Sequence, residues 1–370
     1  MQQKKERKSY WGSLLLMAVL AAVTFYIFLK DNSLEDLVQV IRQANPLFIG
    51  LGLAAMLGFI ACEAASVRTV LNSLGQKLSF RRCYKYAFVA FYYSSITPAA
   101  SGGQPMQLYH MKKDGLNLSF GSLTILIIVF VYQIAELGFG LVMFFLKPSL
   151  IMENLHGMGI LLLYGVLFNA VLLTIMLTAV FSKTLSKKLV NGAVRLLTKL
   201  KILKHPETVL ESVNHQIEEY QQGAAHIRTH PVILIQVLLL TFLQLACSFI
   251  VPYFVYKAFG LNGYSVLDVL AIQSMLTLAV GSLPLPGAVG ASESGFMMLY
   301  KIFFPAQMLL PAMLLSRGIS FYAMLLISGV VAIAAQLLLS RQPIPKACSL
   351  SSRAAASQRD FNGPFYDSTE

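Results

Sequence analysis

Charged residues are scarce in this sequence and make up only 12% of its 370 residues, whereas a soluble globular domain carries about 25%. Hydrophobic residues account for 56%, and the mean hydropathy is +0.65. So little charge excludes an ordinary soluble fold of this size. The composition therefore predicts an all-α polytopic membrane protein.

Clusters of metal ligands are also lacking. The four cysteines have no C-x-x-C spacing, which argues against a zinc site and a disulfide framework. His226 and His230 are four residues apart, but Ile, Arg and Thr lie between them, and we interpret them as a solvated loop pair. We expect no metal and no other cofactor. The sequence also lacks an aromatic-plus-basic module, which argues against nucleic acid.

Positive charge, by contrast, is in excess, with 29 Lys and Arg against 17 Asp and Glu and a net charge of +12. These residues gather between the apolar runs, where they set the orientation of the chain and attract anionic inner-leaflet lipids. They also precede the first apolar run and follow the last one. The pattern predicts a multi-pass protein of the cell membrane with its N- and C-termini in the cytoplasm.

Six apolar runs approach or exceed the length of about 20 residues that spans a membrane. They occupy residues 11–29, 46–66, 119–146, 158–181, 231–256 and 319–339. We interpret residues 1–10 as a basic cytoplasmic N-terminus, 11–340 as the membrane domain and 341–370 as a disordered cytoplasmic tail. Residues 182–230 are predicted to form a cytoplasmic amphipathic connector, and residues 147–157 a short outer loop.

Two further apolar regions are interrupted by proline and glycine, and their arms are too short to span. The arms lie at residues 86–97 and 104–113, and at 268–283 and 292–304. Each region is predicted to form a re-entrant helical hairpin, the first from the cytoplasmic side and the second from the outer side. The two halves then form an inverted repeat, as in secondary transporters. Counted as helices, the hairpins give about seven or eight spans, and kinked spans are the alternative.

The two interruptions are the most informative stretches. Residues 94–105 read SSITPAASGGQP, and residues 281–295 read GSLPLPGAVGASESG. Proline removes a backbone donor and glycine permits tight turns, so each stretch breaks a helix. The predicted break residues are Pro98, Pro284, Pro286, Gly287 and Gly290. A carboxylate at membrane depth, such as Glu293, costs about 2.5–3.5 kcal/mol and marks a functional candidate.

Three motifs resemble a known family, namely PAASGGQP at 98–105, LPLPGAVGASE at 283–293 and SRGISFY at 316–322. They are similar to the flippase-like transmembrane domain of the lysylphosphatidylglycerol synthase/flippase proteins (multiple peptide resistance factors) and their stand-alone relatives. The resemblance covers residues 10–340 and implies a flippase or transporter for phospholipids or lipid-linked anionic headgroups. About 30 residues follow the last span, too few for the aminoacyltransferase domain of the bifunctional proteins. We therefore expect a stand-alone member that is not an enzyme.

The first break supplies half of the predicted substrate-binding residues. Ser101, Gly102, Gly103 and Gln104 lie where the second arm of the hairpin begins. The first N–H groups of a helix are unpaired and carry a partial positive charge. We expect them to cradle a lipid phosphate, because no fixed negative charge lies nearby.

The remaining predicted site residues are charged. Glu293 takes the place at the second break that Gln104 takes at the first. We expect Glu293, together with Glu136, to carry a proton or to face a cationic headgroup, and the alternative is that Glu293 complements its own helix dipole. Arg68 and Arg317 are expected to guide phosphate at the inner and outer entrances.

Three hypotheses for function follow. The first is a flippase whose substrate is a membrane phospholipid such as lysyl-phosphatidylglycerol, or a polyprenyl-phosphate carrier. The second is a lipid-headgroup-modifying membrane enzyme, although the chain lacks the acidic or histidine cluster typical of that class. The third is a subunit or scaffold of a phosphatidylglycerol lysyltransferase system, partnered by a separate synthase or by itself as a homo-oligomer. Carboxylates beside two breaks favour the first hypothesis, because a scaffold has no need to maintain their cost.

Overall fold

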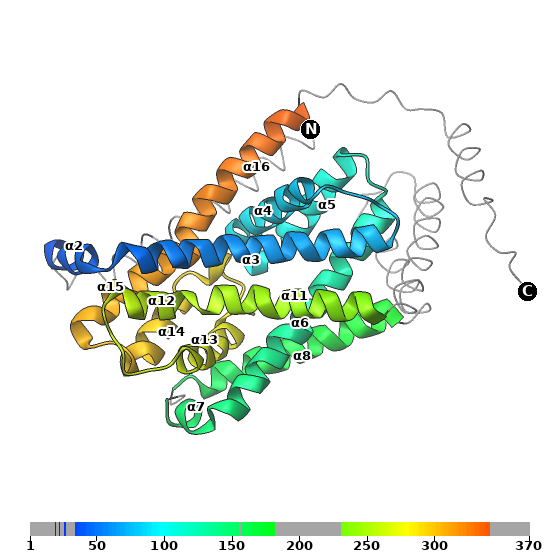
Figure 1. Ribbon diagram of the computed structural model, residues 1–370. Helices are drawn as coiled ribbons and strands as arrows, with labels where there is room; N and C mark the ends of the chain where they lie inside the picture. The colour runs from blue at the N-terminus through cyan, green and yellow to red at the C-terminus, as the bar shows by residue number, and fades with distance from the viewer. Residues whose placement is uncertain are drawn as a thin grey trace, which may run out of the picture. The chain divides into compact units, whose positions relative to one another are not determined.

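The computed structural model describes residues 34–154, 157–181 and 231–340 and the single positions Val19, Ala22 and Tyr26 (Figure 1). All regular structure in these ranges is helical, which confirms the all-α class. Three predicted segments lie outside the described residues, namely the first span at 11–29, the connector at 182–230 and the tail at 341–370. The chain divides into two units, Met1–Ala332 and Ile333–Glu370, and the hairpins, the apolar core and the cavity described below belong to the first.

Four helical segments of the described chain are long and apolar enough to cross a membrane (Figure 1). They are α3 (Pro46–Ser73), α6 (Leu118–Leu146), α11 with α12 (Pro231–Phe249 and Val251–Ala258), and α15 through η4 to α16 (Ala306–Arg317, Gly318–Ala323 and Met324–Ser340). The bent pair α7 (Pro148–Asn154) and α8 (Gly159–Phe181) makes a fifth crossing if it counts as one. These segments correspond to the predicted spans that follow the first.

Two predicted boundaries are wrong. The outer loop at 147–157 contains α7, because Pro148 starts a short helix whose Ile151 is fully buried. The last span begins at Ala306 rather than at residue 319, and Arg317 lies inside it. A single charge does not end this helix, since the charge of Arg317 has a partner, as described below. The helix passes Arg317 through a turn of π-helix, η4.

Local sequence explains where the main helices begin. Asn45 accepts a hydrogen bond from the Leu47 N–H at 2.9 Å, and Pro46 occupies the first turn of α3. Asn117 does the same for α6 through Ser119 N–H, also at 2.9 Å. Both are asparagine N-caps, which satisfy an otherwise unpaired donor of the first turn.

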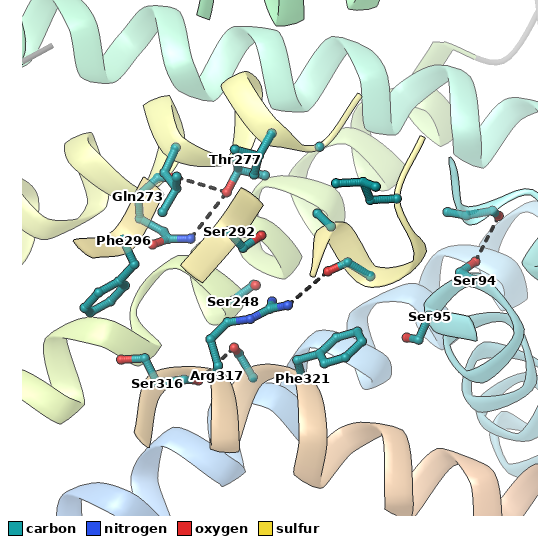
Figure 2. A pocket seen from close by; sticks show the side chains of 18 of the residues that line it. Ser94, Ser95, Ser248, Gln273, Thr277, Ser292, Phe296, Ser316, Arg317 and Phe321 are labelled. Atoms are coloured by element: carbon teal, nitrogen blue, oxygen red, sulfur yellow. Dashed lines mark hydrogen bonds between the residues drawn. The ribbon is translucent and has the colours of Figure 1, made fainter. Parts of the chain in front are cut away.

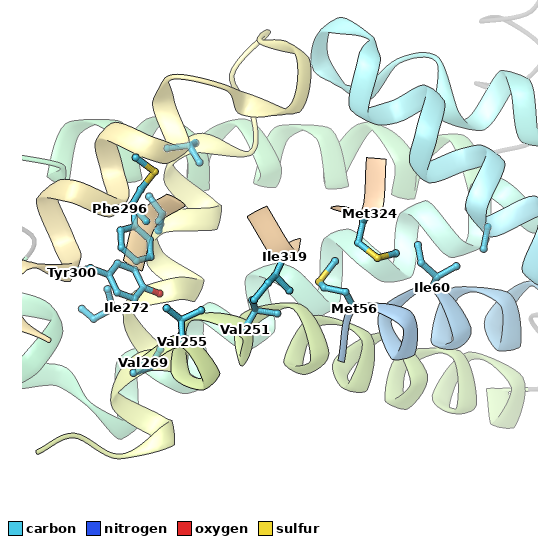
Figure 3. Close-up of a cluster of buried hydrophobic side chains, with 14 of the residues drawn as sticks. Met56, Ile60, Val251, Val255, Val269, Ile272, Phe296, Tyr300, Ile319 and Met324 are labelled. Carbon is cyan, nitrogen blue, oxygen red and sulfur yellow. The ribbon is translucent and has the colours of Figure 1, made fainter. Parts of the chain in front are cut away.

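α3 and α11–α12 run side by side through the centre of the first unit (Figure 1). Small residues permit their close approach: a side-chain carbon at Gly58 would lie 3.4 Å from Cys247 Sγ. Figure 3 shows the apolar core beside this pair, where Met56 and Ile60 of α3, Val251 of α12 and Ile319 of η4 are buried. This core fixes the helices that surround the site.

The two interruptions are helical hairpins. In the first, α4 (Phe80–Ile96) and α5 (Gly103–Lys113) flank the 3-10 turn η1 (Pro98–Ala100). Lys85 and Tyr86, early in α4, both donate hydrogen bonds of 2.6 Å to Asp114 Oδ2, just after α5. The start of α4 therefore lies beside the end of α5, so the chain reverses at the break.

The second hairpin has the same construction. α13 (Val266–Val280) and α14 (Ala291–Leu299) flank the 3-10 turn η2 (Pro286–Ala288). The Tyr300 hydroxyl, just after α14, donates a 2.6 Å hydrogen bond to Gln273 Oε1 in the middle of α13. The turns η1 and η2 contact each other, so the two breaks meet inside the first unit.

Candidate functional site

A cavity of about 320 Å³ lies where the two breaks meet (Figure 2). Both 3-10 turns line it, together with residues of α3, α4, α11 to α15 and η4. Its polar lining is rich in hydroxyl groups, contributed by Ser94, Ser95, Ser248, Thr277, Ser292, Ser316 and Ser320. Arg317 is the charged residue among the described residues that line it.

The first break is closed by local, uncharged hydrogen bonds. The Thr97 hydroxyl donates to Tyr93 O at 2.6 Å and accepts from Gly102 N at 2.8 Å. Pro98 follows, and then Ala99 and Ala100 adopt the left-handed region with φ of 51° and 53°. Such a conformation costs an L-residue about 1–2 kcal/mol. The surrounding hydrogen bonds hold this strained turn.

The second break repeats the first four positions of this backbone and then differs, since Gly290 has φ of 87° where Gly102 has φ of -86°. Leu285 is extended, Pro286 starts the turn, and Gly287 and Ala288 have φ of 58° and 49°. Pro286 is therefore the structural counterpart of Pro98, and Pro284 precedes the turn. Counting on from these prolines, Gly290 corresponds to Gly102, since each is the residue just before its helix.

This match corrects one expectation about Glu293. Glu293 is the third residue of α14, and the third residue of α5 is Pro105. Gln104 corresponds to Ser292 instead. The match between the two breaks that we drew from the sequence was wrong by one position, because it paired Gln104 with Glu293 as polar side chains and did not use the positions of the turns. The carboxylate thus replaces a proline, not an amide.

Glu293 forms a buried ion pair with Arg317. Its side chain is almost fully buried, and Oε1 accepts from Arg317 Nε at 2.8 Å while Oε2 accepts from Gly290 N at 2.7 Å. Arg317 Nη2 donates to Gly287 O at 3.0 Å, and its guanidinium lies 4.6 Å from the centre of the Phe321 ring. One arginine therefore ties the second break to the last span (Figure 2). Arg317 therefore lies beside the second break, and its expected role at the outer entrance stays a prediction.

One edge of the Arg317 guanidinium remains for a ligand. Arginine has five N–H donors, and the hydrogen bonds to Glu293 and Gly287 use two of them. The side chain reaches into the cavity (Figure 2). The Ser316 hydroxyl also lines the cavity, and it is buried without a hydrogen-bond partner among the described residues. The unused donors of the guanidinium suit an oxyanion.

The predicted phosphate cradle lies outside the cavity lining. Ser101 Oγ donates to its own turn at Pro98 O, 2.9 Å away, and the Gly102 N–H is taken by Thr97. A side-chain carbon at Gly103 would lie 2.7 Å from Ala90 O, so this glycine permits the close packing of α5 on α4. Gln104 is half-buried and does not line the cavity.

Two other predicted residues lie apart from the cavity lining. Arg68 is exposed on α3, five residues before the helix ends. Glu136 is buried in α6, and its Oε1 would lie 3.7 Å from a side-chain carbon at Gly281, which does line the cavity. Glu136 is therefore the nearer of the two to the site.

Sequence analysis missed most of the hydroxyl lining. Ser316 and Ser320 are four residues apart, as are Gln273 and Thr277, so each pair shares one face of its helix. The Tyr300 hydroxyl donates to Gln273 Oε1, and Gln273 Nε2 donates in turn to Thr277 Oγ1 at 3.4 Å. Polar residues four positions apart within apolar helices could have predicted these lining residues from the sequence.

No group of three or more His, Cys, Asp or Glu that suits a metal ion occurs in the described part of the chain. Cys62, Cys83 and Cys247 are free thiols, and Cys348 lies outside it. The site is therefore organised by hydroxyls and one ion pair.

Two broken hairpins that meet within a bundle of spanning helices define a polytopic membrane protein with a cavity at their junction, whose mainly apolar wall carries hydroxyl groups and one arginine. The chain belongs to the family described as the lysylphosphatidylglycerol synthase transmembrane region, whose family model matches residues 11–328. It is also similar to a UPF0104 membrane protein of Archaeoglobus fulgidus, with 23% identity over 301 residues, which cover 78% of this chain and 86% of the relative. The family resemblance drawn from the three sequence motifs is thus confirmed.

Proposed function

We propose that the protein is a flippase that moves phospholipids or lipid-linked anionic headgroups between the leaflets of the cell membrane. In this proposal both termini lie in the cytoplasm. The observation that carries it is the cavity between the two breaks, in which Arg317 and a set of hydroxyl groups converge. Polar lining at the junction of discontinuous helices is the usual position of a transporter's substrate site.

The size of the cavity favours a headgroup rather than a whole lipid. Ligand pockets measure about 300–1,000 Å³, and this one, at about 320 Å³, lies at the lower end. Acyl chains would remain in the bilayer beside the apolar outer faces of the helices. A polar headgroup would exchange its water for the serine and threonine hydroxyls that line the cavity.

The ion pair supports reversible binding of an anion. Arginine matches phosphate through two parallel N–H donors. Glu293 holds Arg317 in place and offsets its charge while the cavity is empty, since an unpaired buried charge is costly. A phosphate at the remaining edge of the guanidinium would add charge-assisted hydrogen bonds without displacing Glu293. Binding is then strong enough for selection and weak enough for release.

Proteoliposomes that contain fluorescent phosphatidylglycerol test this proposal. The loss of outer-leaflet fluorescence to a membrane-impermeant quencher measures translocation. Arg317→Gln alone would leave Glu293 unpaired, so the informative variant is the double change Glu293→Gln with Arg317→Gln. We expect it to fold and to slow translocation about 10- to 100-fold, the effect of losing one hydrogen bond to a charged group.

Lys301→Gln is the matched control, because it removes one exposed positive charge outside the cavity. It should retain the wild-type rate. A folded double variant that also keeps the wild-type rate would overturn the role of Arg317. Running lysyl-phosphatidylglycerol beside phosphatidylglycerol ranks the substrates, and an unchanged headgroup mass after incubation would support our proposal that the protein is not an enzyme.

A further inference from the structure

Glu136 is a buried carboxylate that lacks a partner within the described part of the chain. Its side chain is 8% exposed, and it lies well inside the spanning helix α6. The ion pairs of the described ranges involve Asp114, Asp268 and Glu293 instead. Glu293, in particular, is fully occupied by Gly290 and Arg317. Glu136 is therefore the carboxylate beside the second break whose charge no cation offsets.

The C-terminal end of α13 faces this carboxylate. Helix α13 ends at Val280, and Gly281 caps it through a 2.8 Å hydrogen bond to Thr277 O. A side-chain carbon at Gly281 would lie 3.7 Å from Glu136 Oε1. The last carbonyls of a helix carry a partial negative charge, so an ionised Glu136 would face a charge of its own sign. The position favours a neutral carboxyl group or a bound cation.

The other groups around Glu136 are acceptors, neutral side chains or a second carboxylate. Tyr132, one turn earlier on α6, experiences the charges of both Glu136 and Glu63 of α3. Gln244 of α11 donates to Glu63 Oε2 at 3.4 Å, and α13 presents its carbonyl end. The Gln133 Oε1 atom, also one turn from Glu136, is buried without a partner among the described residues. Neither Tyr132 nor Glu63, the other titratable groups of this cluster, is a cation.

Gly281 connects this carboxylate to the cavity. Gly281 lines the cavity, and the absence of a side chain there leaves Glu136 Oε1 within 3.7 Å of where its side-chain carbon would be. Charges interact strongly where little water screens them. An ionised Glu136 would repel an anionic headgroup at Arg317, whereas a protonated Glu136 would not. The charge state of Glu136 would then change the affinity of the cavity for an anionic headgroup.

We propose that Glu136 is a proton-binding site that couples headgroup movement to the proton gradient, an inference that rests on the proposed flippase function. A proton from water binds to the carboxylate on one side of the membrane and neutralises it. The anionic headgroup then enters the cavity, and both are released on the other side, one proton for each headgroup.

The test compares Glu136→Gln with the wild type in proteoliposomes under an imposed pH gradient. Glutamine matches the shape of the protonated carboxyl group, so we expect Glu136→Gln to retain downhill lipid exchange. We also expect it to lose most of the acceleration by the gradient, as well as the lipid-dependent proton uptake that an enclosed pH dye detects. Glu153→Gln, an exposed change in α7, is the matched control and should behave as the wild type.

A Glu136→Gln variant that keeps both the gradient response and proton uptake would overturn the proposal. So would a sodium gradient that accelerates exchange at constant pH. Infrared difference spectra of the purified protein read the site without any transport: the wild type should show a protonated-carboxyl band that titrates with pH and that Glu136→Gln lacks. If this band appears while the wild type moves no lipid, the flippase proposal fails and the proton site stands. If the band is absent from the wild type, the proton site fails.

Discussion

The two breaks share their backbone from the extended residue to the second residue with positive φ, and they differ in how the turn is closed. Each has an extended residue, a proline, two residues with positive φ and a glycine just before the next helix. The first is closed by the Thr97 hydroxyl, within a few residues of the turn. The second is closed by Glu293 and by Arg317, which comes from another helix. Two similar turns are thus closed differently: the first by uncharged groups, and the second by an ion pair that lies beside the cavity.

This difference assigns separate roles to the two turns. The hydrogen bonds that close the first turn come from its own hairpin and involve no charged residue. The second depends on Arg317, whose free edge faces the same cavity. A ligand that binds Arg317 therefore acts on the second turn through Gly287 and Glu293. If one break moves during transport, the physical argument favours the second.

The largest effect should come from breaking the ion pair on one side. We expect Arg317→Gln to lower the free energy of unfolding by about 3–5 kcal/mol, because it leaves Glu293 as a buried, unpaired charge. Thr97→Val at the first break should cost about 1–3 kcal/mol, since it leaves one N–H unsatisfied. Thermal and denaturant unfolding in detergent measures both.

The double variant Glu293→Gln with Arg317→Gln is the control for the stability loss expected of Arg317→Gln. It removes both charges, so it should recover much of the stability that Arg317→Gln loses. Single and double variants with equal stability would show that the two side chains are not coupled. Equal losses for Arg317→Gln and Thr97→Val would remove the contrast between the breaks.

Much of this architecture could be predicted from sequence because it is local. Pro46 after Asn45, Pro98, Pro286 and the long apolar runs each specify a start, a break or a span from a few adjacent residues. The partner of Glu293 could not be predicted in this way. Arg317 lies 24 residues further on, and its contact with Glu293 depends on how the last span packs. Its charge also favoured an end to the helix, whereas the ion pair permits the helix to continue.

Glycine has two uses that sequence does not separate. Gly102 and Gly103 were expected to expose N–H groups to phosphate, but the first is capped by Thr97 and the second permits helix packing. Either role requires the same residue type. Only the position of Ala90 and Ser94 against Gly103 distinguishes them, and that contact is set by the fold of the hairpin.

An intermediate effect is expected at Gly103, whose counterpart at the second break is Ala291. Gly103→Ala places a carbon 2.7 Å from Ala90 O and on the Ser94 hydroxyl, so it should cost about 1–3 kcal/mol through overpacking. The reverse change, Ala291→Gly, meets no such contact and should cost up to about 1 kcal/mol through helix propensity. Unfolding midpoints measure both, and a neutral Gly103→Ala would mean that α5 packs less closely on α4.

The smallest effect concerns the strained turn itself, and it is the one stabilising change. Ala99 has φ of 51°, and its counterpart at the second break is already Gly287, with φ of 58°. Ala99→Gly should stabilise the protein by about 0.5–1 kcal/mol, because relief of left-handed strain of about 1–2 kcal/mol exceeds the added entropy of the unfolded chain. The same change at Ala54, an exposed position within helix α3, should instead cost about 1 kcal/mol.

Gly287→Ala, which gives the second turn the residue of the first, should destabilise, since its carbon would overlap the Phe321 ring beside Arg317. A destabilising Ala99→Gly would show that the first turn is not strained, and that the two breaks share a sequence pattern without sharing a backbone.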